Sequence, residues 1–341
     1  MGKKFRPKRL DMRALERFVL KMQDAAKEQN FDTEEEAELW LQEQLFSDDL
    51  ESYAAVPTTE LEKAQDLAWK AFEEPSEKKR ISMAKKALQI SADCADAYVI
   101  LAEEHVEDNR SEAEALYRKG IEAGRRALGD TAIAHLEKDF WNDYETRPFM
   151  RAVSGLASLL QDFGAGNEAI ELWYELLRLD PSDGQENHLR LVPGLVGVER
   201  YEEAKELIDR YKLQPAPALA YSLALMLFKQ SGDSVEANNA LLNAMEMNGS
   251  VIHRLLTPTH NLPFGDAEYS DEEEAEAESY AMYAYVDWAD AEGALDWIFD
   301  RVEAGLEKQV QRTTLTNTFP GLKIAGSEPD MLQILGSLNQ D

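Results

Sequence analysis

Small and large apolar residues recur along the chain with the spacing of paired helices, most clearly in residues 149–181. The first half of this stretch places three residues at i, i+1 and i+4, which is one face of a helix: Leu156, Ala157 and Leu160. Gly164 is expected to end that helix, and Asn167 to N-cap a second one that ends before Pro181. The second apolar face consists of Ala169, Trp173, Leu176 and Leu177. This order of small, large, glycine, aromatic and proline positions within about 34 residues is the tetratricopeptide pattern.

The same pattern recurs on both sides of the central stretch. A downstream copy comprises Leu223, Ala224, Leu227, Gly232, Ala237, Leu241 and Ala244. An upstream copy comprises Leu101, Ala102, His105, Ala113, Tyr117 and Gly120, and weaker copies lie in 67–87 and 191–208. One helix pair cannot bury its apolar face alone, so stacked pairs must share a core. The sequence therefore predicts an all-α protein, a tetratricopeptide-repeat α-solenoid of antiparallel helix pairs with a short helical N-terminal extension.

Charge runs and turn residues divide the chain into three predicted parts. Residues 1–57 form a charged helical extension and linker, and residues 309–341 form a C-terminal tail with several prolines and glycines. Between them, residues 58–308 form the helical array, with an insertion near 124–148 and a degenerate final repeat.

Local signals predict several helix ends. Ser and Thr are favoured N-caps, and a glutamate three residues later strengthens the signal. The predicted caps are Thr33, Thr59, Thr146 and Ser270. Gly124 and Gly129 are expected to mark turns at the start of the insertion.

The N-terminal region carries opposite charges in neighbouring segments. Basic residues outnumber acidic ones in residues 1–30, whereas residues 31–57 are acidic and contain no Lys or Arg. One reading is that the two segments pair with each other. The alternative is that residues 3–9 form a basic arm that contacts RNA or the ribosome.

The remaining composition narrows the class of protein. The net charge of −30 over 341 residues disfavours binding to nucleic acid, except through residues 3–9, and to anionic membranes. Cys94 stands alone, so no disulfide forms within the chain, and a buried thiol is the simplest expectation. No apolar run approaches the roughly 20 residues of a membrane-spanning helix. We expect an acidic cytoplasmic protein that does not associate with membranes.

Three stretches carry a family resemblance. Residues 86–104, which read KALQISADCADAYVILAEE, resemble the suppression-of-tumorigenicity-7 family, as do the blocks from Val251 to Leu256 and from Glu292 to Leu295. The run 145–150, ETRPFM, is similar to bacterial tetratricopeptide proteins that share these blocks. The resemblance covers roughly residues 60–300 and implies a helical-repeat fold. It implies no activity. The membrane segments of eukaryotic members and the Cys-rich zinc tail of some bacterial relatives are missing from this sequence.

No pattern of residues predicts catalysis, a cofactor or a metal. The histidines show no HExxH or HxxxH spacing, and the single cysteine offers no second thiol ligand. The sequence lacks a phosphate-binding GxxxxGK[ST] loop and a GxSxG nucleophile elbow. We therefore do not expect an enzyme.

The repeat register instead predicts a partner-binding groove along the first helix of each pair. Its predicted residues are Arg147, Arg151, Ser154, Ser158, Gln161, Tyr221 and Leu225. Arg147 and Arg151 lie one helical turn apart, so together they can hold a carboxylate or phosphate. The alternative is that both arginines pair with acidic residues of the same chain, such as Glu145 and Asp162.

Two hypotheses of function remain. The first is a protein-interaction scaffold that binds a peptide or helix of a partner protein in the groove. The second is a regulator that contacts RNA or the ribosome through residues 3–9.

Overall fold

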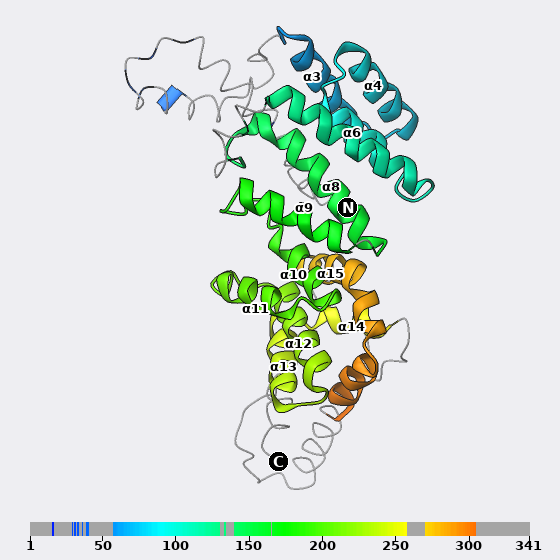
Figure 1. The fold of residues 1–341 in the computed structure, drawn as a ribbon, viewed down its shortest axis with the longest axis vertical. Helices are drawn as coiled ribbons and strands as arrows, with labels where there is room; N and C mark the ends of the chain where they lie inside the picture. Colours follow the sequence, from blue (N-terminus) through cyan, green and yellow to red (C-terminus); the bar gives the residue numbers. More distant parts are fainter. Residues whose placement is uncertain are drawn as a thin grey trace, which may run out of the picture. The chain divides into compact units, whose positions relative to one another are not determined.

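A computed structural model describes most of the array and isolated positions before it. The described residues are 16, 29, 31, 33, 36, 39–40, 57–129, 133, 140–164, 166–257 and 270–304. Across these ranges the regular backbone is helical and contains no strand (Figure 1). The prediction of an all-α protein is confirmed. The predicted tail, residues 309–341, and most of the predicted extension lie outside the described residues.

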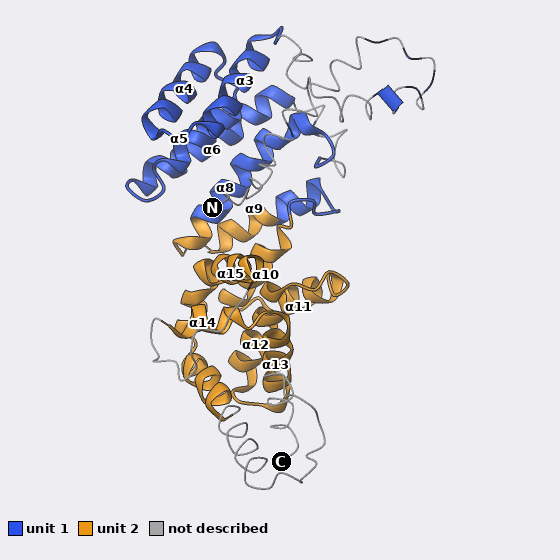
Figure 2. Ribbon diagram, turned by 180° about the vertical axis from the view of Figure 1, so that it is seen from behind, with its two compact units in different colours: residues 1–159, 174–185 blue, residues 160–173, 186–341 orange. Residues whose placement is uncertain are grey.

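The chain divides into two compact units (Figure 2). Unit 1 comprises residues 1–159 and 174–185, and unit 2 comprises residues 160–173 and 186–341. Two helices, α8 (Arg147–Asp162) and α9 (Gly166–Leu179), contribute residues to both units.

Unit 1 is built from helices that pack as sequence neighbours. Among the described residues, the helices with defined bounds before α8 are α3 (Glu60–Glu73), α4 (Glu77–Ile90), α5 (Ala95–Glu103), α6 (Arg110–Leu128) and the 3-10 turn η1 (Tyr144–Thr146). α3 packs against α4 and α5 against α6, as the labelled helices of Figure 2 show. Five alanines of α3 and α4 have no exposed surface: Ala64, Ala68, Ala71, Ala84 and Ala87. Such small side chains let two helix backbones approach closely.

The predicted turn at Gly124 is wrong, because α6 runs through this residue and ends at Leu128. A Cβ at Gly124 would lie 2.8 Å from the Cβ of Phe149, so the glycine provides room for α8 rather than a turn. Gly155 on α8 has the same role, since a Cβ there would lie 2.3 Å from the ring of Tyr117. The predicted turn at Gly129 is confirmed, with a φ of 76° after the last helical residue.

Most predicted helix ends agree with the structure. Thr59 and Ser270 each form a complete capping box with the glutamate three residues later. Gly164 follows α8 with a φ of 85°. Asn167 lies within the first turn of α9 and not before it, because that helix begins at Gly166. The predicted N-cap Thr146 is instead the last residue of η1, and its hydroxyl lies within donating distance of the carbonyl oxygens of Phe140 and Asp143, which anchors the preceding loop at the start of α8.

Unit 2 is also built from packed helices. Its described helices after α9 are α10 (His188–Gly197), α11 (Tyr201–Arg210), α12 (Pro217–Ser231), α13 (Val235–Met247), α14 (Ser250–Leu256) and α15 (Asp271–Asp290), and residues 294–304 are also helical. α12 pairs with α13, and α15 packs against α10, α12 and α14.

Aromatic side chains fill the centre of unit 2. Trp288 and Tyr221 have no exposed surface, and Tyr280 is 1 % exposed. The rings of Tyr221 and Tyr280 lie 5.8 Å apart, and the Trp288 indole donates to the Tyr280 hydroxyl at 3.0 Å. The Tyr221 hydroxyl donates to the carbonyl oxygen of Asn248 at 2.9 Å. The buried polar ends of these rings are therefore satisfied, and α12 and α15 are held together by aromatic contact.

Candidate functional site

Arg151, on α8 in unit 1, lies at the centre of a buried ionic cluster. Its guanidinium donates to the Asp96 carboxylate at 2.8 and 2.6 Å and to the Glu16 carboxylate at 2.7 and 3.0 Å. Asp96 has no exposed surface, and Glu16 is 2 % exposed. Both contacts use two parallel N–H···O bonds, the strongest geometry for an arginine and a carboxylate.

Arg147 completes this group, which we call the Arg151 cluster: Glu16, Asp96, Arg147 and Arg151. The Arg147 guanidinium lies 4.1 Å from the ring centroid of Trp141 and 3.9 Å from that of Tyr144. It donates to the carbonyl oxygen of Trp141 at 3.0 and 3.1 Å, and its Nη1 is 3.9 Å from Glu16. Arg147 is therefore held mainly by the loop before α8, and it adds positive charge beside Glu16.

The cluster extends to Cys94 at the start of α5. The Gln65 amide donates to Asp96 at 2.6 Å, and its oxygen accepts from the Cys94 thiol at 3.6 Å. Burial raises the pKa of the Cys94 thiol to about 12, and the negative charge of Asp96 adds to this shift. The thiol is therefore protonated at neutral pH and lacks the thiolate character of a reactive cysteine.

Burial and ion pairing shift the pKa values of Glu16 and Arg151 in opposite directions. Burial raises the pKa of the Glu16 carboxyl above its ordinary value, although Arg151 acts to lower it. Burial alone lowers the pKa of the Arg151 guanidinium, but Asp96 and Glu16 outweigh burial and raise it. With two acidic and two basic side chains, the charged groups balance. This pairing allows the Asp96 and Glu16 carboxylates to be buried away from water.

Comparison with known proteins places these elements in a family. The family model described as ST7 protein matches residues 20–308. The chain belongs to the ST7 family.

Relatives of this ST7-family chain come from vertebrates and flies. It is 25 % identical over 280 residues to the suppressor of tumorigenicity 7 protein-like of Gallus gallus, covering 74 % of this chain and 49 % of the relative. It is 25 % identical over 256 residues to the protein ST7 homolog of Drosophila melanogaster, covering 66 % and 46 % of the two chains. The chain thus spans about half the length of these relatives. No solved structure matches it.

The ST7-family chain supplies the carboxylates for its own arginines, but from unexpected positions. The predicted acidic partners were Glu145 and Asp162. Arg151 instead pairs with Asp96, which is 55 residues away, and with Glu16, which is 135 residues away. Asp162 belongs to unit 2, where its carboxylate lies 3.5 Å from Arg190. Burial raises the pKa of Asp162, and Arg190 acts to lower it.

The other predicted groove residues fall into both units. Ser154 and Ser158 are half-buried on the part of α8 that belongs to unit 1. In unit 2, Gln161 accepts from the Trp173 indole at 3.1 Å and donates to the Arg190 carbonyl oxygen at 3.0 Å. The Gln161 side chain therefore links α9 and α10 residues of unit 2 by hydrogen bonds.

Tyr221 and Leu225 lie deeper than a groove position requires. Tyr221 has no exposed surface, and Leu225 is 2 % exposed. The cause is α15, which packs on α12 and places Tyr280 against Tyr221. Neither side chain presents surface to a partner in this structure.

Sequence reasoning missed Glu16 and Asp96 as members of the site. Asp96 offered a signal, because it is the one charged residue in the apolar run from Ala95 to Ala102. A lone carboxylate in such a run needs a buried cationic partner. Glu16 offered none, since the N-terminal region contains many charged residues.

No metal-binding group was found where the structure describes the chain. There, no three or more His, Cys, Asp or Glu side chains are grouped to hold an ion. Within the same ranges, none of the helices combines the length and apolar character needed to cross a membrane.

Unit 2 contains a titratable group of its own, Asp287 on α15. Its carboxylate lies against Gly197, where a Cβ would come within 2.6 Å of Oδ1. Burial raises the pKa of the Asp287 carboxyl to about 6, Lys229 acts to lower it, and Asp290 acts to raise it. The folded chain therefore binds this proton more tightly than the unfolded chain, in which the pKa is near 3.8.

We expect Asp287→Asn to stabilise the protein more at pH 7.5 than at pH 4.5. The protonated carboxyl contributes stability that is fully present below about pH 4 and is lost as the pH rises through about 6. Urea denaturation at the two pH values measures the difference. Glu278→Gln, an exposed change on the same helix, is the control. An equal effect of Asp287→Asn at both pH values would contradict the prediction.

Proposed function

We propose that this ST7-family chain is a tetratricopeptide-like scaffold, an α-solenoid that binds a peptide or helix of a partner protein and has no enzymatic activity. The packing of α3 with α4, α5 with α6 and α12 with α13 supports the repeat assignment. Close contacts at Gly124 and Gly155 support it as well, because stacked repeats need small residues where helices meet. A bacterial origin and a cytoplasmic location remain part of this proposal.

The observation that carries the proposal is the contact of Glu16 with Arg151. A carboxylate from a segment 135 residues away is held on α8 by two charge-assisted hydrogen bonds. This is the chemistry by which a helical-repeat surface can recognise an acidic side chain of another segment. Ser154 and Ser158 lie one and two turns further along α8 and are half-buried, so they offer the adjoining surface.

We expect Ser154→Glu with Ser158→Glu to weaken partner binding, because the two longer, charged side chains alter the half-buried α8 surface that the partner would cover. The intact chain is used to capture a partner from nuclease-treated lysate, and binding of the purified partner to each variant is then measured. Far-ultraviolet circular dichroism checks that helical content is unchanged.

The matched control is Ser82→Glu with Ser111→Glu, since both serines are exposed, lie on α4 and α6 of unit 1, and receive the same added charge. This control variant should bind the partner as tightly as the unaltered chain. Equal binding by all three proteins would refute the use of the α8 surface. Retention of ribosomal proteins from an untreated lysate, lost when the lysate is treated with nuclease, would instead favour the second hypothesis, contact with RNA or the ribosome through residues 3–9.

A further inference from the structure

Helix α4 of unit 1 presents a basic face to solvent. The helix packs against α3 and α5, buries Ala84 and Ala87, and lies at the edge of its unit (Figure 2). Four exposed lysines share the side away from these alanines, and we call them the α4 lysine face: Lys78, Lys79, Lys85 and Lys86. Their i, i+1, i+7 and i+8 spacing confines them to roughly a third of the helix circumference.

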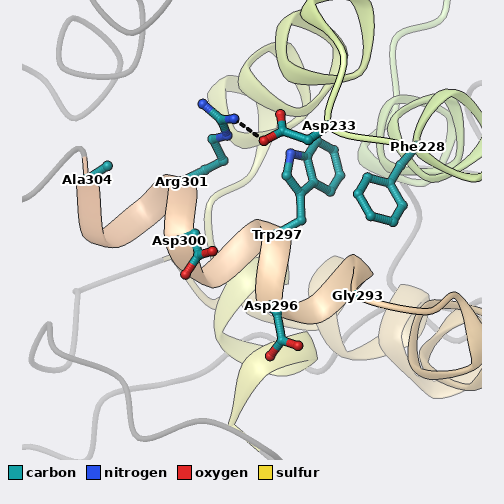
Figure 3. Close-up of a pocket in the computed structure, with 8 residues that line it drawn as sticks. All are labelled: Phe228, Asp233, Gly293, Asp296, Trp297, Asp300, Arg301 and Ala304. Atoms are coloured by element: carbon teal, nitrogen blue, oxygen red, sulfur yellow. Dashed lines mark hydrogen bonds and ion pairs between the residues drawn. The ribbon is translucent and has the colours of Figure 1, made fainter. Parts of the chain in front are cut away.

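The α4 lysine face lacks the acidic partners that many basic side chains of the described residues have. Exposed lysines on other helices pair with an acid three or four residues away, as do Lys63, Lys70 and Lys205. In the pocket of unit 2, Arg301 pairs with Asp233 (Figure 3). On α4 itself, no acid stands three or four positions from any lysine of the face. Glu74, in the turn before α4, is 3.6 Å from Lys79, and the other three lysines form no ion pair with any residue that the structure describes.

Two of these lysines also oppose the charge preference of their helix. Lys78 and Lys79 occupy the first turn of α4, where the positive end of the helix dipole favours acids over bases. The like charges on one face repel each other as well. Acids outnumber bases in the chain by 66 to 36, so an exposed face without a single acid departs from the rest of its composition. Helix stability does not explain this face, whereas binding of an acidic ligand does.

The α4 lysine face suits a short acidic segment of a protein. At a rise of about 1.5 Å per residue, the stretch from Lys78 to Ile90 is about 18 Å long, which one short helix can cover. Ile90 follows Lys86 by one turn and is 37 % exposed, so it adds an apolar contact at the end of the face. Single-stranded nucleic acid is bound through stacking side chains, and α4 has no aromatic residue. Its one arginine, Arg80, is held by Glu104.

We propose that the α4 lysine face binds an acidic segment of a protein. Carboxylates of that segment pair with the four ammonium groups, and an apolar residue of the segment covers Ile90. The net charge of −30 repels a long polyanion more than a short acidic segment, which favours the protein ligand over RNA. This second surface goes beyond the proposed scaffold function, which uses the surface of α8.

The test uses the full chain and a fluorescent, alanine-based helical peptide with glutamates at the spacing of the α4 lysines. Fluorescence anisotropy follows binding at physiological and at high salt. We expect saturable binding that weakens at high salt and is lost when glutamine replaces every glutamate. Binding should weaken by roughly tenfold in the face variant, which lacks the four charge contacts: Lys78→Gln, Lys79→Gln, Lys85→Gln and Lys86→Gln. Absence of saturable binding by the unaltered chain would overturn the proposal.

The control variant removes the same total charge from other helices and loops: Lys119→Gln, Lys205→Gln, Arg210→Gln and Lys212→Gln. All four residues are exposed, and none belongs to α4. This variant should bind the peptide with nearly unchanged affinity. Equal weakening by the two quadruple variants would show that bulk charge alone attracts the peptide, and would overturn the proposal. Far-ultraviolet circular dichroism checks that both variants keep their helical content.

A single-stranded RNA oligonucleotide is the competing probe. We expect it to bind the unaltered chain no more tightly than it binds the face variant. RNA that binds more tightly than the peptide, and loses that binding when the four lysines are changed, would overturn the assignment to a protein segment.

Ser82→Glu separates this proposal from the scaffold function. Ser82 is exposed and lies between Lys78 and Lys86, one turn from each, so a glutamate there should weaken peptide binding severalfold. A partner bound through α8 should be retained. Unchanged peptide binding would overturn the α4 proposal and leave the scaffold function standing. If peptide binding weakens as expected while Ser154→Glu with Ser158→Glu leaves the captured partner bound, the α4 proposal stands and the use of the α8 surface is refuted.

Discussion

Replacing Arg151 with alanine should destabilise unit 1 by about 3–5 kcal/mol, the cost of leaving buried charges without their partner. Asp96 has no exposed surface and Glu16 is 2 % exposed, so neither carboxylate can regain full hydration without opening the structure. Urea denaturation of the full chain measures the loss. Hydrogen exchange at the amides of α5 and α8 locates it in unit 1.

Arg125→Ala is the matched control for this prediction. Arg125 also pairs with an acid in unit 1, Glu175 at 2.6 Å, but its side chain is 52 % exposed. Exposed ion pairs contribute about 0.2–1 kcal/mol, so this loss should be small. A combined change, Glu16→Gln with Asp96→Asn and Arg151→Met, removes all three charges and should cost less than Arg151→Ala alone. Similar losses of stability for Arg151→Ala and Arg125→Ala would show that the buried cluster contributes no more than an exposed ion pair, which would contradict the prediction.

Trp288→Ala should destabilise unit 2 by about 3–5 kcal/mol. The indole has no exposed surface and donates to the buried Tyr280 hydroxyl, so alanine leaves a large cavity and an unsatisfied polar group. The measurement is urea denaturation followed by hydrogen exchange at α12 and α15.

Val286→Ala is its control, two residues earlier on the same helix. Val286 is 62 % exposed, and surface substitutions of this kind change stability by about 0.5 kcal/mol or less. Trp288→Phe should give an intermediate loss, because it keeps an aromatic ring but no indole donor. A small effect of Trp288→Ala would mean that the aromatic core of unit 2 is not a principal source of its stability.

Local chemistry made parts of the fold predictable. The capping boxes at Thr59 and Ser270 depend on residues three positions apart, and the stop at Gly164 depends on one residue. The error at Gly124 has the opposite cause. Whether a glycine ends a helix or admits a neighbour depends on what packs against it, and here Phe149 packs there. Because that contact is tertiary, the residues around Gly124 do not predict it.

Of the candidate site, only the two arginines were predictable from the sequence. The one-turn spacing of Arg147 and Arg151 predicted that both could approach one carboxylate, and both lie beside Glu16. The identity of that acid was not accessible, because a contact across 135 residues depends on how the whole unit folds. The burial of Tyr221 was not predictable for a similar reason, since α15 packs on α12. The repeat pattern predicts which residues face outward within one helix pair. It does not predict that a later helix, here α15, packs over that pair.

The Arg151 cluster also sets an order of events during synthesis. Ribosomes add roughly 5–20 residues per second, so Asp96, 55 residues before Arg151, is made about 3–11 s before its partner. During that interval the Asp96 carboxylate lacks the Arg151 guanidinium and must stay hydrated. α5 can pack fully only when α8 arrives, and Glu16 is then fixed in the same step. Full burial of Asp96 and fixation of Glu16 therefore both wait for the synthesis of α8.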